Sequence, residues 1–152
     1  GDCQQEMIKV LAHGRNKEEF LERVPEAYET CRRYVHRLHE GDVDIRDLVL
    51  NSRLTHEPEE YQTTSRASIV AQQLIKAGRE LHAGQKVRYI MIDVDSQNPL
   101  RRVKALELLT EDTNYDAMAY AKLCFRAFEN LIPAQHLSRV HLSDHQPVKI
   151  VQ

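Results

Sequence analysis

The chain has 152 residues, of which 41% are hydrophobic and 29% are charged, with five glycines and five prolines. This composition is typical of an ordinary globular protein and excludes low-complexity, disordered and collagen-like chains, and the length suffices for one domain or for two small lobes that share a core. The formal net charge of −2 argues against a free-standing nucleic-acid binder, which is usually basic, although it allows a local patch that works beside a basic partner domain.

The three cysteines, Cys3, Cys31 and Cys124, form no CxxC pair. An odd number without the spacing of a disulfide framework suggests reduced thiols in an intracellular protein. No apolar run approaches the ~18 residues of a membrane span, and no signal sequence is visible. The chain begins with Gly-Asp-Cys rather than with Met, which we interpret as the beginning of an excised domain.

The first elements predicted are two helices that form a helical hairpin over residues 3–41. A short amphipathic pattern ends at Gly14, and apolar residues then follow a spacing close to 3.5 as far as Gly41, with a kink or restart expected at Pro25. The outer face of the second helix is cationic and is interpreted either as a solvated surface or as a stripe that faces phosphates; its residues are Arg32, Arg33, His36, Arg37 and His39. The spacing of Cys31, His36 and His39 matches no standard metal site.

A strand-loop-helix segment is predicted over residues 47–78. The apolar run 48–50 alternates into residues 51–54 as a strand does, and three hydroxyl residues precede a helical pattern that ends at Gly78. The unpaired N–H groups at the beginning of a helix attract anions, above all phosphate. The candidate DNA-binding residues are therefore Arg53, Tyr61, Gln62, Thr63, Thr64, Ser65, Arg66, Gln72 and Lys76. Alternatively, Arg53 merely pairs with Glu57 or Glu60.

The rest of the chain is predicted to hold a β element over residues 85–109 and a terminal helix over residues 115–132. Residues 86–94 read as a strand, whereas residues 102–109 fit either a returning strand or a short helix. Pro133 closes the terminal helix, and residues 134–152 are expected to form a C-terminal tail. The predicted fold class is α+β, mainly α, with a small antiparallel β element.

The sequence gives little support for a catalytic site. Asp93 and Asp95 have the spacing of a metal-binding carboxylate pair, but they lack an evident third carboxylate and a positioned lysine or histidine. The chain also lacks a glycine-rich phosphate loop and a nucleophile elbow. We therefore expect no catalytic residue, no metal ligand and no cofactor in this chain, and a binding role instead.

Several stretches, in this order, resemble the thumb subdomain of family B (alpha-like) DNA polymerases, particularly the archaeal enzymes. Residues 48–54 (LVLNSRL) match a strand motif of that family, and Tyr61 and residues 65–71 match the segment that follows it. Residues 84–90 (GQKVRYI) and 115–120 (YDAMAY) match two later motifs. The resemblance covers residues 2–133, and we expect these to be one thumb-like domain (residues 1–133). Arg66 and Ala67 replace the family's Pro-His, and residues 55–58 are an insertion.

The resemblance implies the thumb of a DNA-directed DNA polymerase, a nucleotidyltransferase of DNA replication, which grips the primer–template duplex for processivity. In that family Mg²⁺ is held by the palm, so this chain would be inactive alone and would need no cofactor. The implied partners are double-stranded DNA and the palm and exonuclease domains, in the cytoplasm at the nucleoid or in the nucleus, with no membrane. A sliding clamp remains a candidate partner, although no clamp hook follows Pro133. The alternative is an α-helical protein–protein interaction module that docks through residues 24–38 or through the terminal helix.

Overall fold

The computed structural model describes residues 2–12, 17–57 and 65–132 and divides the chain into two compact units. The first unit comprises Gly1–Val43 and Ala117–Gln152, and the second comprises Asp44–Asp116. The expected tail, and the candidate residues Tyr61, Gln62, Thr63 and Thr64, lie outside the described residues. The described elements confirm the predicted class, because four helices accompany one three-stranded antiparallel sheet. Among the residues described, no helix has the length and apolarity needed to cross a membrane.

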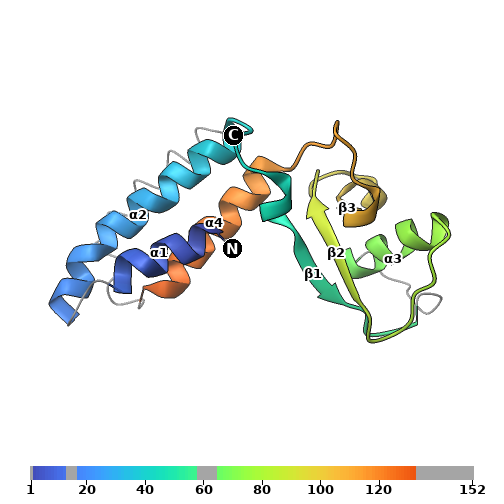
Figure 1. The fold of residues 1–152 in the computed structure, drawn as a ribbon, viewed down its shortest axis with the longest axis horizontal. Coiled ribbons are helices and arrows are strands. Elements are labelled where there is room, and N and C mark those ends of the chain that lie inside the picture. Colours follow the sequence, from blue (N-terminus) through green and yellow to red (C-terminus); the bar gives the residue numbers. More distant parts are fainter. Residues whose placement is uncertain (1, 13–16, 58–64, 133–152) are drawn as a thin grey trace. The chain divides into compact units, whose positions relative to one another are not determined.

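The first unit packs three helices, α1 (Asp2–Ala12), α2 (Lys17–His39) and α4 (Ala117–Leu131), against one another (Figure 1). The predicted helical hairpin is present as α1 and α2. Helix α2 continues through Pro25 without a restart, because a proline ring removes one hydrogen bond without ending a helix that is held by packing. Tyr28 packs its ring against Phe125 and Phe128, with centroid distances of 6.0 and 5.3 Å.

The apolar seam of α2, within residues 24–38, is buried inside this unit. Val24, Cys31, Val35 and Leu38 are all at most 4% exposed. A docking role for residues 24–38 would need this seam on the surface, so the packing argues against the alternative of an interaction module that uses it.

The three cysteines meet in the core of the same unit. The structure joins Cys3 to Cys124 as a disulfide and leaves Cys31 as a buried free thiol. The pairing differs from the expected set of three reduced thiols, which rested only on their spacing along the chain. Burial raises the pKa of the Cys31 thiol to about 12, because an apolar surrounding disfavours the thiolate.

The second unit is built on a sheet of order β1-β2-β3, formed by β1 (Leu50–Arg53), β2 (Lys86–Met91) and β3 (Val103–Ala105). Residues 48 and 49, expected to open the first strand, belong instead to the 3-10 helix Ile45–Leu48 and the residue after it. Residues 102–109 combine both predicted alternatives, since β3 is followed directly by the 3-10 helix Leu106–Leu108.

Helix α3 (Arg66–Lys76) covers the sheet with Ile69, Val70 and Leu74, each at most 2% exposed. The helix ends in a Schellman motif, in which the N–H of Gly78 donates to the carbonyl of Ile75 and the N–H of Arg79 to that of Leu74. Gly78 has φ +90°, which a glycine adopts without a Cβ penalty. Helix α3 therefore ends just before Gly78.

Candidate nucleic-acid interface

One face of the β1–β2 pair is covered and the other is open. Along β2, Val87 and Tyr89 are buried, whereas Lys86 and Arg88 are exposed. Side chains alternate between the two faces of a strand, so Lys86 and Arg88 share the open face. We call the exposed set Asn51, Arg53, Lys86 and Arg88 the open face.

The strand register brings these side chains together across the sheet. Arg53 lies directly opposite Lys86, and Asn51 lies directly opposite Arg88. Residues opposite one another in an antiparallel pair have Cβ atoms about 5 Å apart on the same face. The open face therefore concentrates three cations and one amide within two residue pairs.

These cations have no acidic partner within the part of the chain that the structure describes. No ion pair joins Arg53, Lys86 or Arg88 to any carboxylate within the described ranges. The Arg53 guanidinium donates one hydrogen bond, from Nη1 to the carbonyl oxygen of Gly84. The side chain is exposed, so its remaining N–H groups can donate to an anion from solvent.

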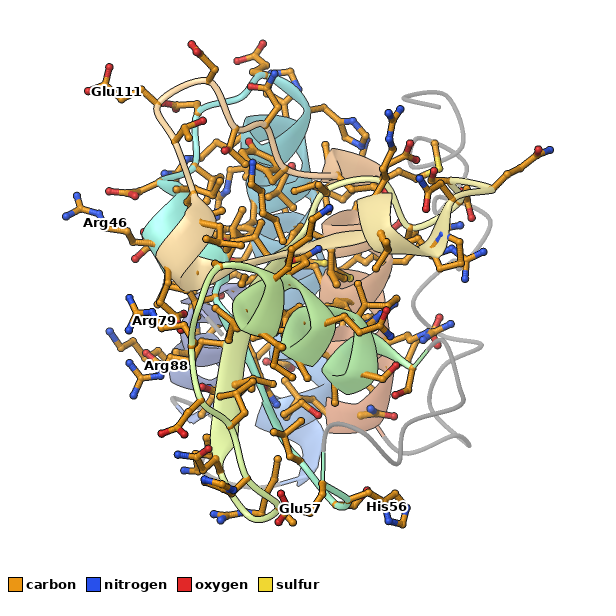
Figure 2. The ribbon with its side chains drawn as sticks, turned by 90° about the vertical axis from the view of Figure 1, so that its right-hand side faces the viewer. Arg46, His56, Glu57, Arg79, Arg88 and Glu111 are labelled. Atoms are coloured by element: carbon orange, nitrogen blue, oxygen red, sulfur yellow. A yellow bond between two sulfur atoms is a disulfide. The ribbon has the colours of Figure 1, made fainter. Side chains whose placement is uncertain are left out.

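The alternative partner of Arg53 is used elsewhere. Glu57 accepts a hydrogen bond from the backbone N–H of Ala83 at 3.1 Å, and its other carboxylate oxygen lies 3.3 Å from Nδ1 of His82. This carboxylate therefore fastens the loop at residues 82–83, whereas Glu60 lies outside the described residues. Figure 2 shows Arg46, Arg79 and Arg88 extending outward on one side of the view, while His56 and Glu57 lie at its lower end.

The beginning of α3 is closed by its own cap. The Ser65 hydroxyl accepts the backbone N–H of Ser68 at 3.2 Å, and the Ser65 carbonyl accepts the Ser68 hydroxyl at 2.8 Å. One of the free N–H groups expected to hold a phosphate is thus satisfied internally. Arg66, the first residue of the helix, is exposed.

The described predicted residues fall into two groups. Arg53 belongs to the open face, whereas Ser65, Arg66, Gln72 and Lys76 belong to α3, where each is exposed. No hydrogen bond or ion pair between described residues links the two groups, so their joint action on one anion stays a prediction.

Sequence reasoning did not include Lys86 and Arg88 in the site. The alternation of charged and apolar residues in 86–89 fits a strand whose Lys86 and Arg88 side chains share one face. Their position beside Arg53 depends on the register with a strand more than thirty residues earlier, which no local pattern contains. A hypothesis that residues 50–53 pair with residues 86–89 would have placed Lys86 and Arg88 in the site.

The other cationic surface, on α2, is paired locally. The Arg32 guanidinium lies 3.7 Å from the Glu29 carboxylate, measured from Nη1 to Oε2. Nε2 of His36 lies 3.1 Å from Oε1 of Glu40, and Nε of Arg37 lies 3.7 Å from Oδ2 of Asp42. Exposed pairs of this kind contribute little to stability, but each carboxylate cancels part of the field that would attract phosphates.

One histidine and one arginine of α2 favour the same interpretation. Burial, together with the neighbouring His36, lowers the pKa of His39 and favours its neutral form. Arg33, the remaining cation of this surface, contacts the Thr30 hydroxyl at 3.4 Å. The α2 surface is therefore the weaker of the two candidates for holding a nucleic acid.

The acidic turn does not assemble a metal site. Asp93 and Asp95 are exposed, and among the described residues only the three cysteines bring three metal-ligating side chains together. Asp116 is engaged structurally instead, because its carboxylate accepts the N–H of Val94 at 3.0 Å and its own N–H donates to Met91. These contacts hold the chain in place just before α4, which begins at Ala117 rather than at residue 115.

The match to known families decides the affiliation. Residues 2–134 match the family model described as DNA polymerase family B. The chain belongs to DNA polymerase family B. No curated protein matches this family B chain.

A solved structure shows the same fold. The family B chain is similar to the family B DNA polymerase from the hyperthermophilic archaeon Pyrobaculum calidifontis, with a TM-score of 0.70 and 19% sequence identity. The match covers 88% of this chain and 17% of the archaeal enzyme, so the family B chain spans about a sixth of that polymerase.

Proposed function

We propose that this family B chain is the thumb portion of a DNA-directed DNA polymerase and that it grips the primer–template duplex. The observation that carries the proposal is the open face, on which Arg53, Lys86 and Arg88 lie in two facing residue pairs with no described carboxylate beside them. Phosphates are the anions that such a cluster meets on a nucleic acid.

The proposed grip is blind to sequence. A polymerase must hold every duplex that it makes, so contacts belong on phosphate and sugar rather than on base edges. Lys86 and Arg88 lie two residues apart on one strand, roughly 7 Å, which is about the rise of two nucleotides. The proposal also includes Ser65, Arg66, Gln72 and Lys76 as a second contact track on α3, the helix that covers the opposite face of the sheet. Residues 61–64 stay candidates from the sequence alone.

Catalysis is proposed to lie outside this chain. The chain supplies no catalytic residue, and Mg²⁺ is proposed to be held by a palm domain of the parent enzyme. The palm and exonuclease domains are then its protein partners, in an intracellular, archaeal-type replication or repair enzyme. Incubation of the chain with primer–template, Mg²⁺ and deoxynucleotides should give no primer extension; extension that survives further purification would contradict this part.

The experiment for the grip is the affinity of the 152-residue chain for a fluorescent primer–template duplex at low salt. Arg53→Ala combined with Arg88→Ala should weaken binding roughly tenfold, because two phosphate contacts are lost. The matched control is Arg46→Ala combined with Lys122→Ala, which also removes two exposed positive charges. Equal weakening in both double variants would mean that net charge, not the open face, governs binding.

Two further measurements separate the parts of the proposal. Arg66→Ala alone should weaken binding several-fold if the beginning of α3 belongs to the track, and an unchanged affinity would remove α3 from the site. Two duplexes of unrelated sequence should bind within about twofold of each other, because phosphate contacts carry no sequence information.

A further inference from the structure

All three cysteines of the chain converge on one point in the first unit. Cys3 comes from α1, Cys31 from α2 and Cys124 from α4, and their exposed fractions are 5%, 0% and 5%. The three sulfur atoms lie within 4.8 Å of one another. Each helix of the unit therefore contributes one sulfur to the same small volume of the core.

A disulfide uses only two of the three sulfurs. Cys3 is joined to Cys124, and the sulfur of Cys31 lies 2.9 Å from the sulfur of Cys124. A single buried cysteine is commonly no more than a small apolar side chain. Three that meet from positions 93 and 121 residues apart need a further explanation, since any apolar residue would fill the core equally well.

The set has the composition of a soft-metal site. Thiolates select Cu⁺ and Zn²⁺ over hard ions such as Mg²⁺. No described histidine, aspartate or glutamate joins the group, so the protein offers three sulfur ligands and no oxygen or nitrogen ligand from its described side chains. A bound cation would also compensate the charge of thiolates that are otherwise disfavoured in an apolar core.

We propose that Cys3, Cys31 and Cys124 form a three-thiolate site for one thiophilic metal ion, Cu⁺ or Zn²⁺, once the Cys3–Cys124 disulfide is reduced. A cellular dithiol supplies the reduction: its two thiols become a disulfide, and Cys3 and Cys124 each gain a hydrogen as thiols. The metal ion then replaces up to three thiol protons, which pass to solvent. Reduced and metal-bound, the site links α1, α2 and α4; oxidised, it links only α1 and α4 covalently.

The test uses the 152-residue chain, reduced with a phosphine under nitrogen and titrated separately with Cu⁺, Zn²⁺ and Cd²⁺ as a spectroscopic probe. We expect one Cu⁺ or one Zn²⁺ per chain, a thiolate-to-metal charge-transfer band in the ultraviolet, and no binding of Mg²⁺. We also expect binding at least about tenfold weaker in the oxidised chain, which retains only one thiol. No charge-transfer band in the folded, reduced chain would overturn the proposal.

Cys31→Ser is the decisive variant, because it leaves the Cys3–Cys124 pair intact. Its metal affinity should fall at least about tenfold, whereas an affinity equal to that of the wild type would overturn a three-sulfur site. The matched control is Ala121→Ser, which puts a hydroxyl into the same core on α4 and should bind normally. If Cys31→Ser does not fold, alkylation of the wild type decides: three thiols protected by metal support the site, and two or fewer overturn it.

Discussion

At the scale of single residues, Ser65 caps the beginning of α3 in addition to its proposed role in phosphate binding. Its hydroxyl accepts the N–H of Ser68 and so caps α3, the helix that covers the sheet. Replacing Ser65 with Ala should lower the free energy of unfolding by about 1 kcal/mol, as the loss of an N-cap does. Urea unfolding measures this difference.

Ser65→Asp is the control for the cap. Aspartate is an N-cap residue of equal rank, so stability should be close to that of the wild type. The same variant places a negative charge at the proposed phosphate track and should weaken duplex binding. Full duplex affinity in Ser65→Asp would show that the beginning of α3 does not meet DNA.

Asp44 and Arg46 give a residue-scale prediction about pH. Hydrogen bonds from the Arg46 side chain and backbone N–H lower the pKa of Asp44 to about 2. Because the pKa is lowered in the folded state, this carboxylate stabilises the fold above its ordinary pKa, and the contribution disappears as the pH falls toward 2.

The measurement is the titration of the Asp44 carboxyl carbon by NMR. In Arg46→Ala the side-chain donors are lost, so the pKa of Asp44 should rise toward its ordinary value. Arg46→Lys keeps the charge and should give an intermediate result. A pKa near 2 in all three proteins would assign the shift to some cause other than Arg46.

At the scale of elements, a single side chain fastens α3 to β3. Gln73 donates from its amide nitrogen to the carbonyls of Val103 and Leu100 at 2.7 and 3.0 Å, and its amide oxygen accepts the N–H of Ala105 at 2.8 Å. Gln73→Ala leaves these backbone groups without the partner that the fold supplies, and we expect a loss of about 1–3 kcal/mol in unfolding free energy.

The neighbouring Gln72 is the matched control for Gln73. Gln72 is exposed, so Gln72→Ala should change the unfolding free energy by less than about 0.5 kcal/mol. It should instead act on duplex binding, if the proposed track on α3 is right. Equal destabilisation by the two variants would contradict the contacts of Gln73.

At the open face, we expect changes that stabilise the fold to weaken duplex binding. Arg53 and Lys86 are like charges directly across the β1–β2 ladder, an arrangement that destabilises a strand pair. Lys86→Glu should therefore raise the unfolding free energy by about 0.2–1 kcal/mol while it weakens duplex binding. Lys86→Gln should lie between the two proteins in both measurements, and a variant that improves both properties would speak against a DNA-holding role.

At the scale of the whole molecule, the sequence predicted the helices and strands better than it predicted which of them contact one another. The spacing of apolar residues was sufficient for all four helices, because helix periodicity is local. The strand pairing that collects Lys86 and Arg88 beside Arg53 joins segments far apart in the chain. The convergence of the three cysteines has the same origin, so their spacing along the chain did not predict the pairing of Cys3 with Cys124.

The boundaries that differed also have physical causes. The strand expected from residue 48 begins at Leu50, because Asp44 accepts the N–H of Arg46 and starts a 3-10 helix immediately before it. The terminal helix begins at Ala117, because Asp116 is bound to Met91 and Val94. In both places a tertiary or capping contact overrides the local helix and strand propensities.

The central claim is that the open face, and not the α2 surface, holds the duplex. Its most direct test compares two variants that each lose three positive charges. One carries Arg53→Ala, Lys86→Ala and Arg88→Ala; the other carries Arg32→Ala, Arg33→Ala and Arg37→Ala. For each, the duplex association constant is measured across a range of salt concentrations, with helicity checked by circular dichroism.

Each phosphate contact contributes about 0.9 to the slope of log K against log salt. The account predicts that the open-face variant loses about 2.7 from the magnitude of that slope, while the α2 variant loses less than about one. A larger loss in the α2 variant, or an unchanged slope in the open-face variant, would contradict it.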